Sequence, residues 1–322
     1  MTTAGSQKVE GRTQIQIPYR TEFPLSLGSA LALDLSETAR TPLMIYDSPV
    51  DLENLTSTNA LFLRSDGQSG TYLSTAVSNQ SSVLNDLSLS LGVSLGSSYL
   101  GTGVTGSYEK ASSDAKQMDT TTRRMSVQAG TVHLASRIQL TEAAQRMLRS
   151  KPGGYQAFRE AFGDFYVSGA IIGGEAAVTV MTKSESNASA DKIKITAEAH
   201  FLCFSGETTV AEKDFNSAYH SLQFGVVAFD SLTQHLVDMP LAEEQSLPLD
   251  KARQLCQLFD EFVQNMQQRV EASMSRWPEL FRHRAKLTSR DLSSIMRSGL
   301  VTQLVLTPWS THRDVRPFAL AE

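Results

Sequence analysis

The sequence predicts an α+β fold in which antiparallel strands are flanked by helices. Apolar residues recur at every second position in 87–95 and again in 125–140, as expected of half-buried strands. Residues 249–274 instead carry apolar residues at helical spacing, and the segment starts just after Pro248, which favours a helix. With 322 residues that are 41% hydrophobic, the chain can form the core of one large domain or two small ones.

Composition excludes several classes of protein. No run approaches the about 18 consecutive apolar residues of a membrane-spanning helix. A net charge of −5 argues against a nucleic-acid partner, which requires a concentrated basic surface. Two cysteines cannot form a disulfide framework, and no zinc pattern accompanies them, so we expect no metal and no cofactor. The first 20 residues lack a secretion signal, which predicts a chain that starts in the cytosol.

The first half of the chain predicts strands around a polar segment. Short apolar patches and prolines up to about residue 80 indicate short strands and loops. After the strand at 87–95, residues 97–125 are rich in Ser, Thr and Gly and have too few apolar residues for a core face. The alternating run from 125 to 140 changes phase near Gly130, which indicates a β-bulge.

Two helices and a buried strand follow. Thr141 is in position to cap a helix that stops at the Pro-Gly-Gly beginning at Pro152. The spacing of Tyr155, Phe158 and Phe162 places three aromatic rings on one face of a second, short helix. Residues 164–181 are almost continuously apolar or small, which predicts a strand covered on both faces.

A second polar segment at 184–220 contains a sharply alternating stretch. Its apolar face is formed by Ile193, Ile195, Ala197, Ala199, Phe201 and Cys203. The residues between them are polar or charged. We expect a further buried strand at 221–232 and an extended segment near 299–308.

A basic cluster lies in the last part of the chain. Its members are Arg276, Arg282, His283, Arg284, Lys286 and Arg290. The plain interpretation is a solvated helix face, and contact with anionic lipid headgroups is the functional alternative.

Three enzyme motifs occur without the structural context that they require. Ser94 lies in a G-x-S-x-G motif but inside a continuing strand pattern, whereas a nucleophile elbow needs a strand, a turn and a helix. The G-x-G-x-x-G at 101–106 precedes a polar stretch that cannot form the packed helix of a dinucleotide site. Ser107 and Lys110 have the S-x-x-K spacing without its companion motifs. We therefore predict no enzyme and no catalytic residue, and a hydrolase would require that Ser94→Ala abolish a measurable esterase activity.

One spacing is more specific than these. Starting at Tyr155, the chain reads an aromatic residue, six positions, Phe162-Gly163-Asp164-Phe165-Tyr166, six positions and Gly-Gly. This pattern resembles the signature of the membrane-attack-complex/perforin (MACPF) family. The positions that agree in type are Tyr155, Phe162, Gly163, Tyr166, Gly173 and Gly174. Asp164 and Phe165 depart from it, because the family has Thr and His there.

The same positions also have a physical interpretation of their own. Gly163 is in place to end the helix that carries Tyr155 and Phe162. Gly173 and Gly174 interrupt a strand where a bend, a bulge or a close backbone approach is expected. On the glycines alone, a buried strand that happens to contain Gly-Gly is the favoured interpretation.

The resemblance implies a fold and a domain organisation. MACPF proteins and cholesterol-dependent cytolysins contain a bent, twisted four-stranded antiparallel sheet flanked by helices. Two inserted segments in that sheet are helical in the soluble monomer and refold into membrane β-hairpins. The matching polar insertions here are 97–125 and 184–220, inside a MACPF-like domain over 1–275. Residues 276–322 would form an extension that packs on the same domain or contacts the membrane.

The resemblance also implies a function. The chain is expected to bind a target membrane through a lipid or a receptor, to form a homo-oligomeric ring or arc, and to insert two hairpins per subunit as a β-barrel pore. The candidates for lipid-facing positions are Ile193, Ile195, Ala197, Ala199, Phe201 and Val104. Candidates for headgroup contact are Arg282, Arg284 and Lys286. The signature residues would serve as hinge and packing positions.

Two questions stay open at this point. Without a signal, the protein would be cytosolic or released by a nonclassical route, and it would reach the target-cell membrane on assembly. The alternative function is a MACPF-fold binding or interaction protein that forms no pores.

Overall fold

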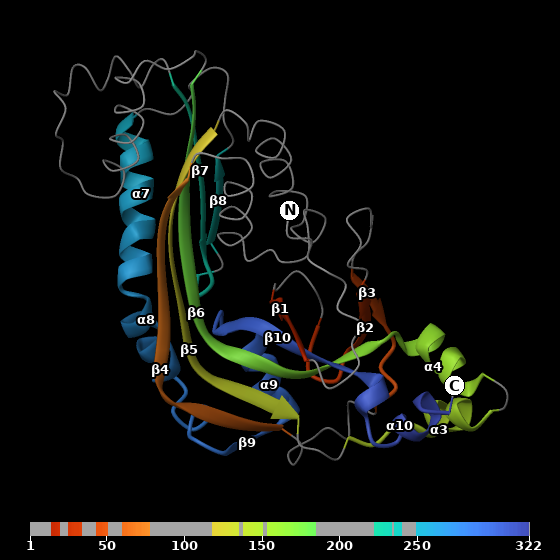
Figure 1. Cartoon of the computed structure of the whole chain (residues 1–322). Helices are drawn as coiled ribbons and strands as arrows, with labels where there is room; N and C mark the ends of the chain where they lie inside the picture. Colours follow the sequence, from red (N-terminus) through yellow and green to blue (C-terminus); the bar gives the residue numbers. More distant parts are fainter. Residues whose placement is uncertain are drawn as a thin grey trace. The chain divides into compact units, whose positions relative to one another are not determined.

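The computed structural model describes most of the chain outside the two polar segments (Figure 1). The described residues are 14–19, 25–33, 43–50, 60–77, 118–134, 138–150, 153–184, 222–233, 235–239 and 249–321. The chain divides into two compact units. The first unit comprises Met1–Gln68, Gln128–Gly173 and Ala272–Glu322, and the second comprises Ser69–Val127 and Gly174–Glu271.

The strands among these residues belong to one ten-stranded sheet. They are β1 (Ile15–Pro18), β2 (Ala30–Leu33), β3 (Leu43–Tyr46), β4 (Ala60–Val77), β5 (Met118–Leu134), β6 (Phe165–Ser184), β7 (Leu222–Asp230), β8 (His235–Met239), β9 (Ala285–Leu287) and β10 (Val301–Pro308). The order is β1-β10-β6-β5-β4-β9, with β7 beside β6, β8 beside β7, and β2 joining β3 to β6. The predicted total of four strands is therefore wrong, because short strands from both ends of the chain extend the sheet. Four consecutive neighbours in it, β4, β5, β6 and β7, include the three longest strands.

Strand β6 has a different partner in each unit. In the first unit its residues from Phe165 to Ile172 pair antiparallel with β10. In the second unit its residues from Ala176 to Ser184 pair antiparallel with β7. The strand is buried at every residue from Ile171 to Val180, as the near-continuous apolar run predicts.

The helices are short except for one. They are α3 (Glu142–Arg149), α4 (Gly154–Phe162), α7 (Leu249–Gln264), α8 (Met266–Met274), α9 (Ser289–Met296), α10 (Arg316–Ala319) and the 3-10 helix η3 (Trp309–Thr311). The Thr141 side chain accepts a hydrogen bond from the amide of Ala144, which confirms the predicted cap of α3. The predicted helix over 249–274 is two helices, because the helical pattern breaks at Asn265.

Two predicted boundaries differ from the structure. β5 begins at Met118, so residues 118–125 belong to a strand and not to the first polar insertion. The reason is a set of tertiary contacts, since Thr122 and Arg123 both bond to other elements of the second unit. Likewise, β4 is one strand of 18 residues where short strands and loops were expected, because β5 and β9 pair along it. The strand predicted at 87–95 lies outside the described residues.

The phase change near Gly130 is visible in the burial of β5. Val127 and Ala129 are buried on one side of it, and Val132 is buried on the other, one residue out of step. A Cβ atom at Gly130 would lie 2.6 Å from the Leu63 carbonyl oxygen and the Phe62 ring. Glycine therefore allows β5 to change phase while it stays close to β4.

Candidate functional site

Helix α4 meets strand β6 at Gly163, as the signature spacing predicts. Gly163 ends α4, and its amide donates to the carbonyl of Arg159 at 2.8 Å. Its φ of 72° and ψ of −168° form a combination that side chains strongly disfavour. A Cβ atom there would lie 2.5 Å from the Leu31 carbonyl oxygen of β2. Both its backbone conformation and its surroundings therefore require glycine.

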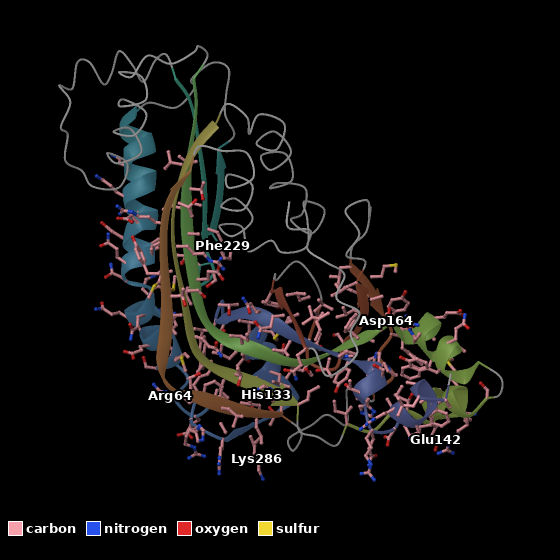
Figure 2. The ribbon with its side chains drawn as sticks, viewed as in Figure 1. Arg64, His133, Glu142, Asp164, Phe229 and Lys286 are labelled. Carbon is pink, nitrogen blue, oxygen red and sulfur yellow. The ribbon has the colours of Figure 1, made fainter. Side chains whose placement is uncertain are left out.

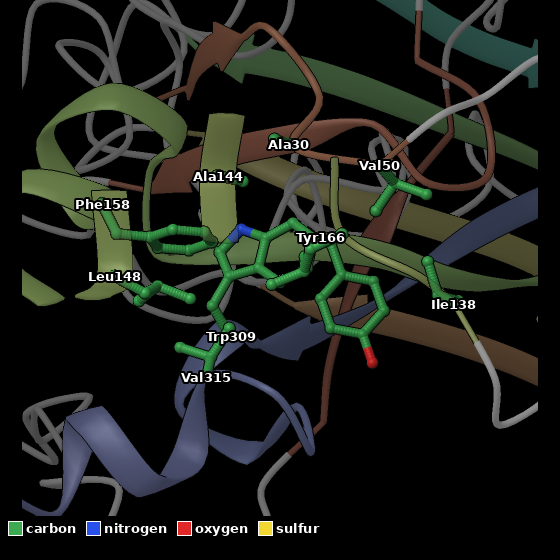
Figure 3. Close-up of a cluster of buried hydrophobic side chains, with 10 residues drawn as sticks. Ala30, Val50, Ile138, Ala144, Leu148, Phe158, Tyr166, Trp309 and Val315 are labelled. Atoms are coloured by element: carbon green, nitrogen blue, oxygen red, sulfur yellow. The ribbon is translucent and has the colours of Figure 1, made fainter. Parts of the chain in front are cut away.

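The aromatic signature residues pack in one cluster with Trp309, which follows β10. Figure 3 shows Tyr166 and Phe158 beside the Trp309 ring. Tyr166 stacks on the Trp309 ring with centroids 4.4 Å apart, and Phe158 meets the same ring edge-on at 5.7 Å. Phe162 lies 4.9 Å from Phe158, and Tyr155 packs against the same cluster. Phe158 and Trp309 are completely buried. The cluster thereby ties α4 and the start of β6 to the end of β10.

The two departures from the signature are accommodated at this junction. Arg159 donates to the carboxylate of Asp164, and both side chains are well exposed. Such an ion pair contributes at most about 1 kcal/mol. The Asp164 backbone accepts from the amide of Trp309 at 2.9 Å and donates to the Leu31 carbonyl at 3.1 Å. Phe165 lies in register with Leu31 of β2.

The paired glycines of the signature have different surroundings. In the first unit, the amide of Gly173 donates to the carbonyl of Leu300 at 2.7 Å. In the second unit, a Cβ atom at Gly174 would lie 2.5 Å from the Met266 sulfur and from a Val270 methyl group, both on α8. Helix α8 therefore lies directly on the strand at Gly174.

Two arginine–aspartate pairs hold the helices of the second unit to its strands. Arg123 on β5 pairs with Asp260 on α7, whose side chain is 7% exposed. Arg269 on α8 pairs with Asp230 at the end of β7 through two hydrogen bonds of 2.8 Å. The Arg269 guanidinium also lies 4.2 Å from the ring centroid of Phe262. Sequence analysis missed both pairs, although an aspartate on the buried side of an otherwise apolar helix stripe was a usable signal.

Buried polar contacts also join β5 to β6 in the second unit. The hydroxyls of Thr122 and Thr179 lie 2.9 Å apart with both residues fully buried. Arg124 pairs with Glu175, and the Glu175 amide donates to the hydroxyl oxygen of Ser231 at 2.9 Å. Polar groups buried in this way must be paired, so they define one alignment of the two strands.

Two stretches between described strands contain most of the predicted polar segments 97–125 and 184–220. We name residues 78–117 the first insert and residues 185–221 the second insert. The first insert joins β4 to β5, which are neighbours in the sheet. The second joins β6 to β7, whose antiparallel register continues to the last pair, Ser184 and Leu222. The predicted lipid-facing residues lie within the inserts and therefore outside the described residues; they are Val104, Ile193, Ile195, Ala197, Ala199 and Phe201.

The basic cluster does not form a helix face, contrary to the plain interpretation. Arg282 and Arg284 lie in a turn, Arg284 has a φ of 61°, and Lys286 belongs to β9. All three side chains are exposed, and Figure 2 shows Lys286 extending away from the ribbon. Arg282 forms an exposed ion pair with Glu279 at 3.8 Å. The turn and strand arise because β9 pairs with the first residues of β4.

The three enzyme motifs, at 92–96, 101–106 and 107–110, lie outside the described residues. His133, the histidine downstream of Ser94, lies half-buried on β5, and burial lowers its pKa below the usual range (Figure 2). Ser94 itself is outside the described residues. Within the described ranges, no three His, Cys, Asp or Glu side chains cluster as metal ligands. No helix in the same ranges is both long and apolar enough to span a bilayer.

No family model and no curated protein match this chain. Among solved structures, it is similar to pneumolysin, with a TM-score of 0.37 and 10% identity over 93% of this chain and 60% of that chain. It is also similar to a cell invasion protein with a MAC/Perforin domain from Bacteroides thetaiotaomicron, with a TM-score of 0.32 and 12% identity over 86% and 64%. For suilysin, a cytotoxin protein from Streptococcus suis, the TM-score is 0.31 with 11% identity over 94% and 62%.

One of these three proteins has a MAC/Perforin domain. Residues 155–174 of this chain resemble the signature of that family. The chain spans less than two thirds of the length of each of these three proteins. Their identities lie below 25% and their TM-scores below 0.5. The functional proposal therefore rests on the residues and contacts of this chain.

Proposed function

We propose that this chain is a non-enzymatic pore-forming protein of the MACPF and cholesterol-dependent cytolysin class. It binds a target membrane as a monomer, assembles into a ring or arc, and inserts two β-hairpins per subunit into a barrel. The observation that carries the proposal is the position of the two inserts. Each joins two neighbouring strands of one sheet, so each can extend an existing strand pair into a longer hairpin.

The length of the inserts supports this role. A tilted membrane strand needs about 9 to 11 residues, so a hairpin needs about 20 residues and a turn. Both 78–117 and 185–221 exceed that length. In the second insert, apolar residues from Ile193 to Phe201 alternate with polar ones, as a strand between lipid and a water-filled lumen requires.

Assembly follows from the chemistry of strands in lipid. A single hairpin would expose unpaired amide and carbonyl groups at its edges, and each such group costs several kcal/mol in hydrocarbon. Pairing with the hairpins of neighbouring subunits removes these edges. We therefore propose a homo-oligomer as the active form.

We assign hinge and packing roles to the six signature residues. Gly163 allows the close turn from α4 into β6, and Tyr155, Phe162 and Tyr166 anchor that turn in the aromatic cluster around Trp309. Gly174 supports α8, so any rearrangement of β6 must change this contact. Gly173 bonds to the segment that precedes β10.

The C-terminal extension, 276–322, is proposed to be part of the same domain as 1–275. Its strand β10 pairs with β1 on one side and with β6 on the other. Residues Arg282, Arg284 and Lys286 in it are proposed to contact lipid headgroups, because they are exposed and cationic.

Site-directed fluorescence tests the pore directly. In a background with Cys203→Ala and Cys256→Ala, single cysteines placed one at a time from 193 to 201 would carry an environment-sensitive dye. With liposomes, we expect the dye to enter an apolar environment at odd positions and to stay in water at even ones. A label at Gln267, exposed on α8, is the matched control and should not change. Absence of the alternation, with no dye release and no rings by electron microscopy, would overturn the proposal.

The second candidate is a MACPF-fold binding protein that forms no pores. The substitutions at Asp164 and Phe165 favour it, because the family has Thr and His at these two signature positions and Asp164 here pairs with Arg159 instead. A disulfide lock between an insert and the second unit separates the candidates. Activity that is lost on locking and restored by reduction supports refolding, whereas activity that persists in the locked protein supports the binding protein.

A further inference from the structure

A pocket of about 510 Å³ opens on the first unit, and none of the residues that line it has been assigned a role above. The residues that line it are Trp277, Arg290, Ser293, Ser294, Arg297 and Ser298. Five of them occupy positions i, i+3, i+4, i+7 and i+8 along α9 and the turn after it. This spacing gathers two arginines and three serines on one face of a single helix.

Helix α9 is held in place on its other face and at its start. Ile295 and Met296 are buried beneath it. At the N-terminus, the Thr288 hydroxyl accepts from the amide of Asp291 at 3.2 Å, and the Asp291 carboxylate accepts from the amide and the hydroxyl of Thr288. The carboxylate nearest in sequence to Arg290, that of Asp291, is thus already hydrogen-bonded within the capping box. The polar face is therefore presented by a fixed element.

Positive charge at the pocket is left uncompensated. Within the described part of the chain, neither Arg290 nor Arg297 forms an ion pair with a carboxylate. Residues 276–297 contain six Lys or Arg and only two Asp or Glu, in a chain whose net charge is −5. An anion would find there cationic groups that the described residues do not pair with a carboxylate.

One hydrogen bond orients the pocket for an anion. Nη2 of Arg297 donates to the Ser293 oxygen at 2.7 Å, which fixes the guanidinium across the helix face. Ser293 accepts in that bond, so its own hydroxyl hydrogen can be donated to a ligand oxygen. Ser294 and Ser298 instead donate to the carbonyls of Arg290 and Ile295.

Trp277 places an apolar ring at the edge of this basic surface. It is 38% exposed, whereas Trp309, the second of the two tryptophans, is completely buried. An exposed indole beside arginines is typical of surfaces that meet lipid headgroups, and it can equally stack on a soluble ligand.

We propose that this pocket binds a phosphate group, carried by a lipid headgroup or by a soluble phosphate ester. Arginine pairs with phosphate through two parallel N–H···O bonds, and a phosphate has enough acceptor oxygens for both guanidinium groups and the Ser293 hydroxyl. The site is separate from the Arg282, Arg284 and Lys286 candidates. Phosphate binding at this site does not depend on pore formation, so equilibrium binding tests it separately.

The test uses the full chain and tryptophan fluorescence. Since Trp309 is buried, a change in emission reports mainly on Trp277. The soluble probes are inorganic phosphate and glycerol phosphate. The vesicles are phosphatidylcholine alone, phosphatidylcholine with phosphatidic acid, and phosphatidylcholine with oleic acid at matched surface charge, with co-sedimentation as a second readout. We expect binding to phosphatidic acid vesicles well above binding to oleic acid vesicles at about 0.15 M ionic strength. Response to the soluble probes as well would identify a soluble ester as a ligand.

A charge-matched pair of double variants isolates the pocket. Arg290→Gln with Arg297→Gln should weaken phosphatidic acid binding by about tenfold or more. Arg282→Gln with Lys286→Gln removes the same charge outside the pocket and should weaken it by less than about threefold. Ser294→Glu, at an exposed helix position, should mimic the first variant by repulsion. Three results would overturn the proposal: equal loss of phosphatidic acid binding in the two double variants, no response to any phosphate probe, or binding to oleic acid vesicles as strong as to phosphatidic acid vesicles.

Binding and dye release separate this site from the proposed pore. If vesicle binding depends on Arg290 and Arg297 but no dye is released, the proposed phosphate site is supported and the proposed pore is overturned. If dye is released and the pocket variants bind phosphate as the unchanged protein does, the proposed pore is supported and the proposed phosphate site is overturned.

Discussion

Arg123 on β5 donates from one nitrogen, Nη1, to both carboxylate oxygens of Asp260 on α7, at 2.9 Å each. The Asp260 side chain is 7% exposed and the Arg123 side chain 19% exposed. Asp260 also accepts from Gln264 at 2.7 Å. The long helix of the second unit is therefore fastened to the sheet by a largely dehydrated charge pair, which makes its loss costly.

Asp260→Asn should lower the free energy of unfolding by about 3 kcal/mol, because it removes the negative charge that faces the Arg123 guanidinium in a poorly hydrated site. The measurement is the urea midpoint at unchanged slope. Glu261→Gln, at the exposed neighbouring position, is the control and should stay within about 0.5 kcal/mol. Equal shifts for the two variants would contradict the role assigned to the pair.

Gly174→Ala should destabilise the protein by about 1 to 3 kcal/mol, because the added methyl group overlaps Met266 and the stiff Val270 side chain. Gly70→Ala is a suitable control in the same unit, since its methyl group would meet the flexible end of Met125. Combining Gly174→Ala with Val270→Ala should cost less than the sum of the two single changes. Strict additivity in this double-mutant cycle would show that α8 does not rest on Gly174.

Gly163→Ala should cost about 1 to 3 kcal/mol from backbone strain, with a further penalty from its clash with the Leu31 carbonyl. Gly153→Ala is the matched control, because Gly153 also has a positive φ, of 85°, but has open space around its Cβ position. Thermal unfolding of both variants measures the difference. If the two variants unfold at the same temperature, the contact with β2 contributes nothing to the requirement for glycine at position 163.

Acid should destabilise the first unit through His312. Burial lowers the pKa of His312, against the opposing effects of Asp314 and of a hydrogen bond with the Ile138 backbone. Its Nδ1 accepts from the amide of Asp314 at 3.3 Å, which requires that nitrogen to be unprotonated. The unfolded chain takes up the proton near pH 6.5, whereas the folded protein resists it to lower pH.

The free energy of unfolding should therefore be highest above about pH 7 and should fall as the pH drops below about 6.5. His312→Gln should reduce this slope when urea midpoints are compared from about pH 8 to about pH 5. His133→Gln should also reduce it, since burial lowers the pKa of His133 as well. If the pH dependence of the free energy of unfolding is unchanged in both variants, protonation of these histidines is not its cause.

Local patterns were enough to predict several elements. Helix α3 with its Thr141 cap, helix α4 with its end at Gly163, and strand β6 all follow from spacing within a few turns or pleats. The extended segment that became β10 is likewise predicted by its own residues. Each of these signals is local, because capping and side-chain periodicity act between residues that are close in sequence.

Long-range pairing was beyond local signals. The sheet has ten strands and not the four predicted. β1, β2, β9 and β10 have partners far along the chain, and β3 and β8 are added as hairpin partners of β2 and β7. The same cause extended β5 back to Met118, into residues whose polar side chains indicate a loop until Thr179 and Asp260 satisfy them. Hydrogen bonds between distant segments leave no periodicity in either one.

The sequence by itself determined that glycines and aromatic rings stand at the spacing of a known signature, and that two polar segments separate strands. Tertiary structure decided what those residues touch. Gly174 lies under α8, Tyr166 stacks on Trp309, and the Arg–Ser face of α9 meets Trp277 in a pocket. The physical reason is that residue type and spacing act along the chain, whereas packing, charge pairing and ligand pockets arise only when distant residues share one small volume.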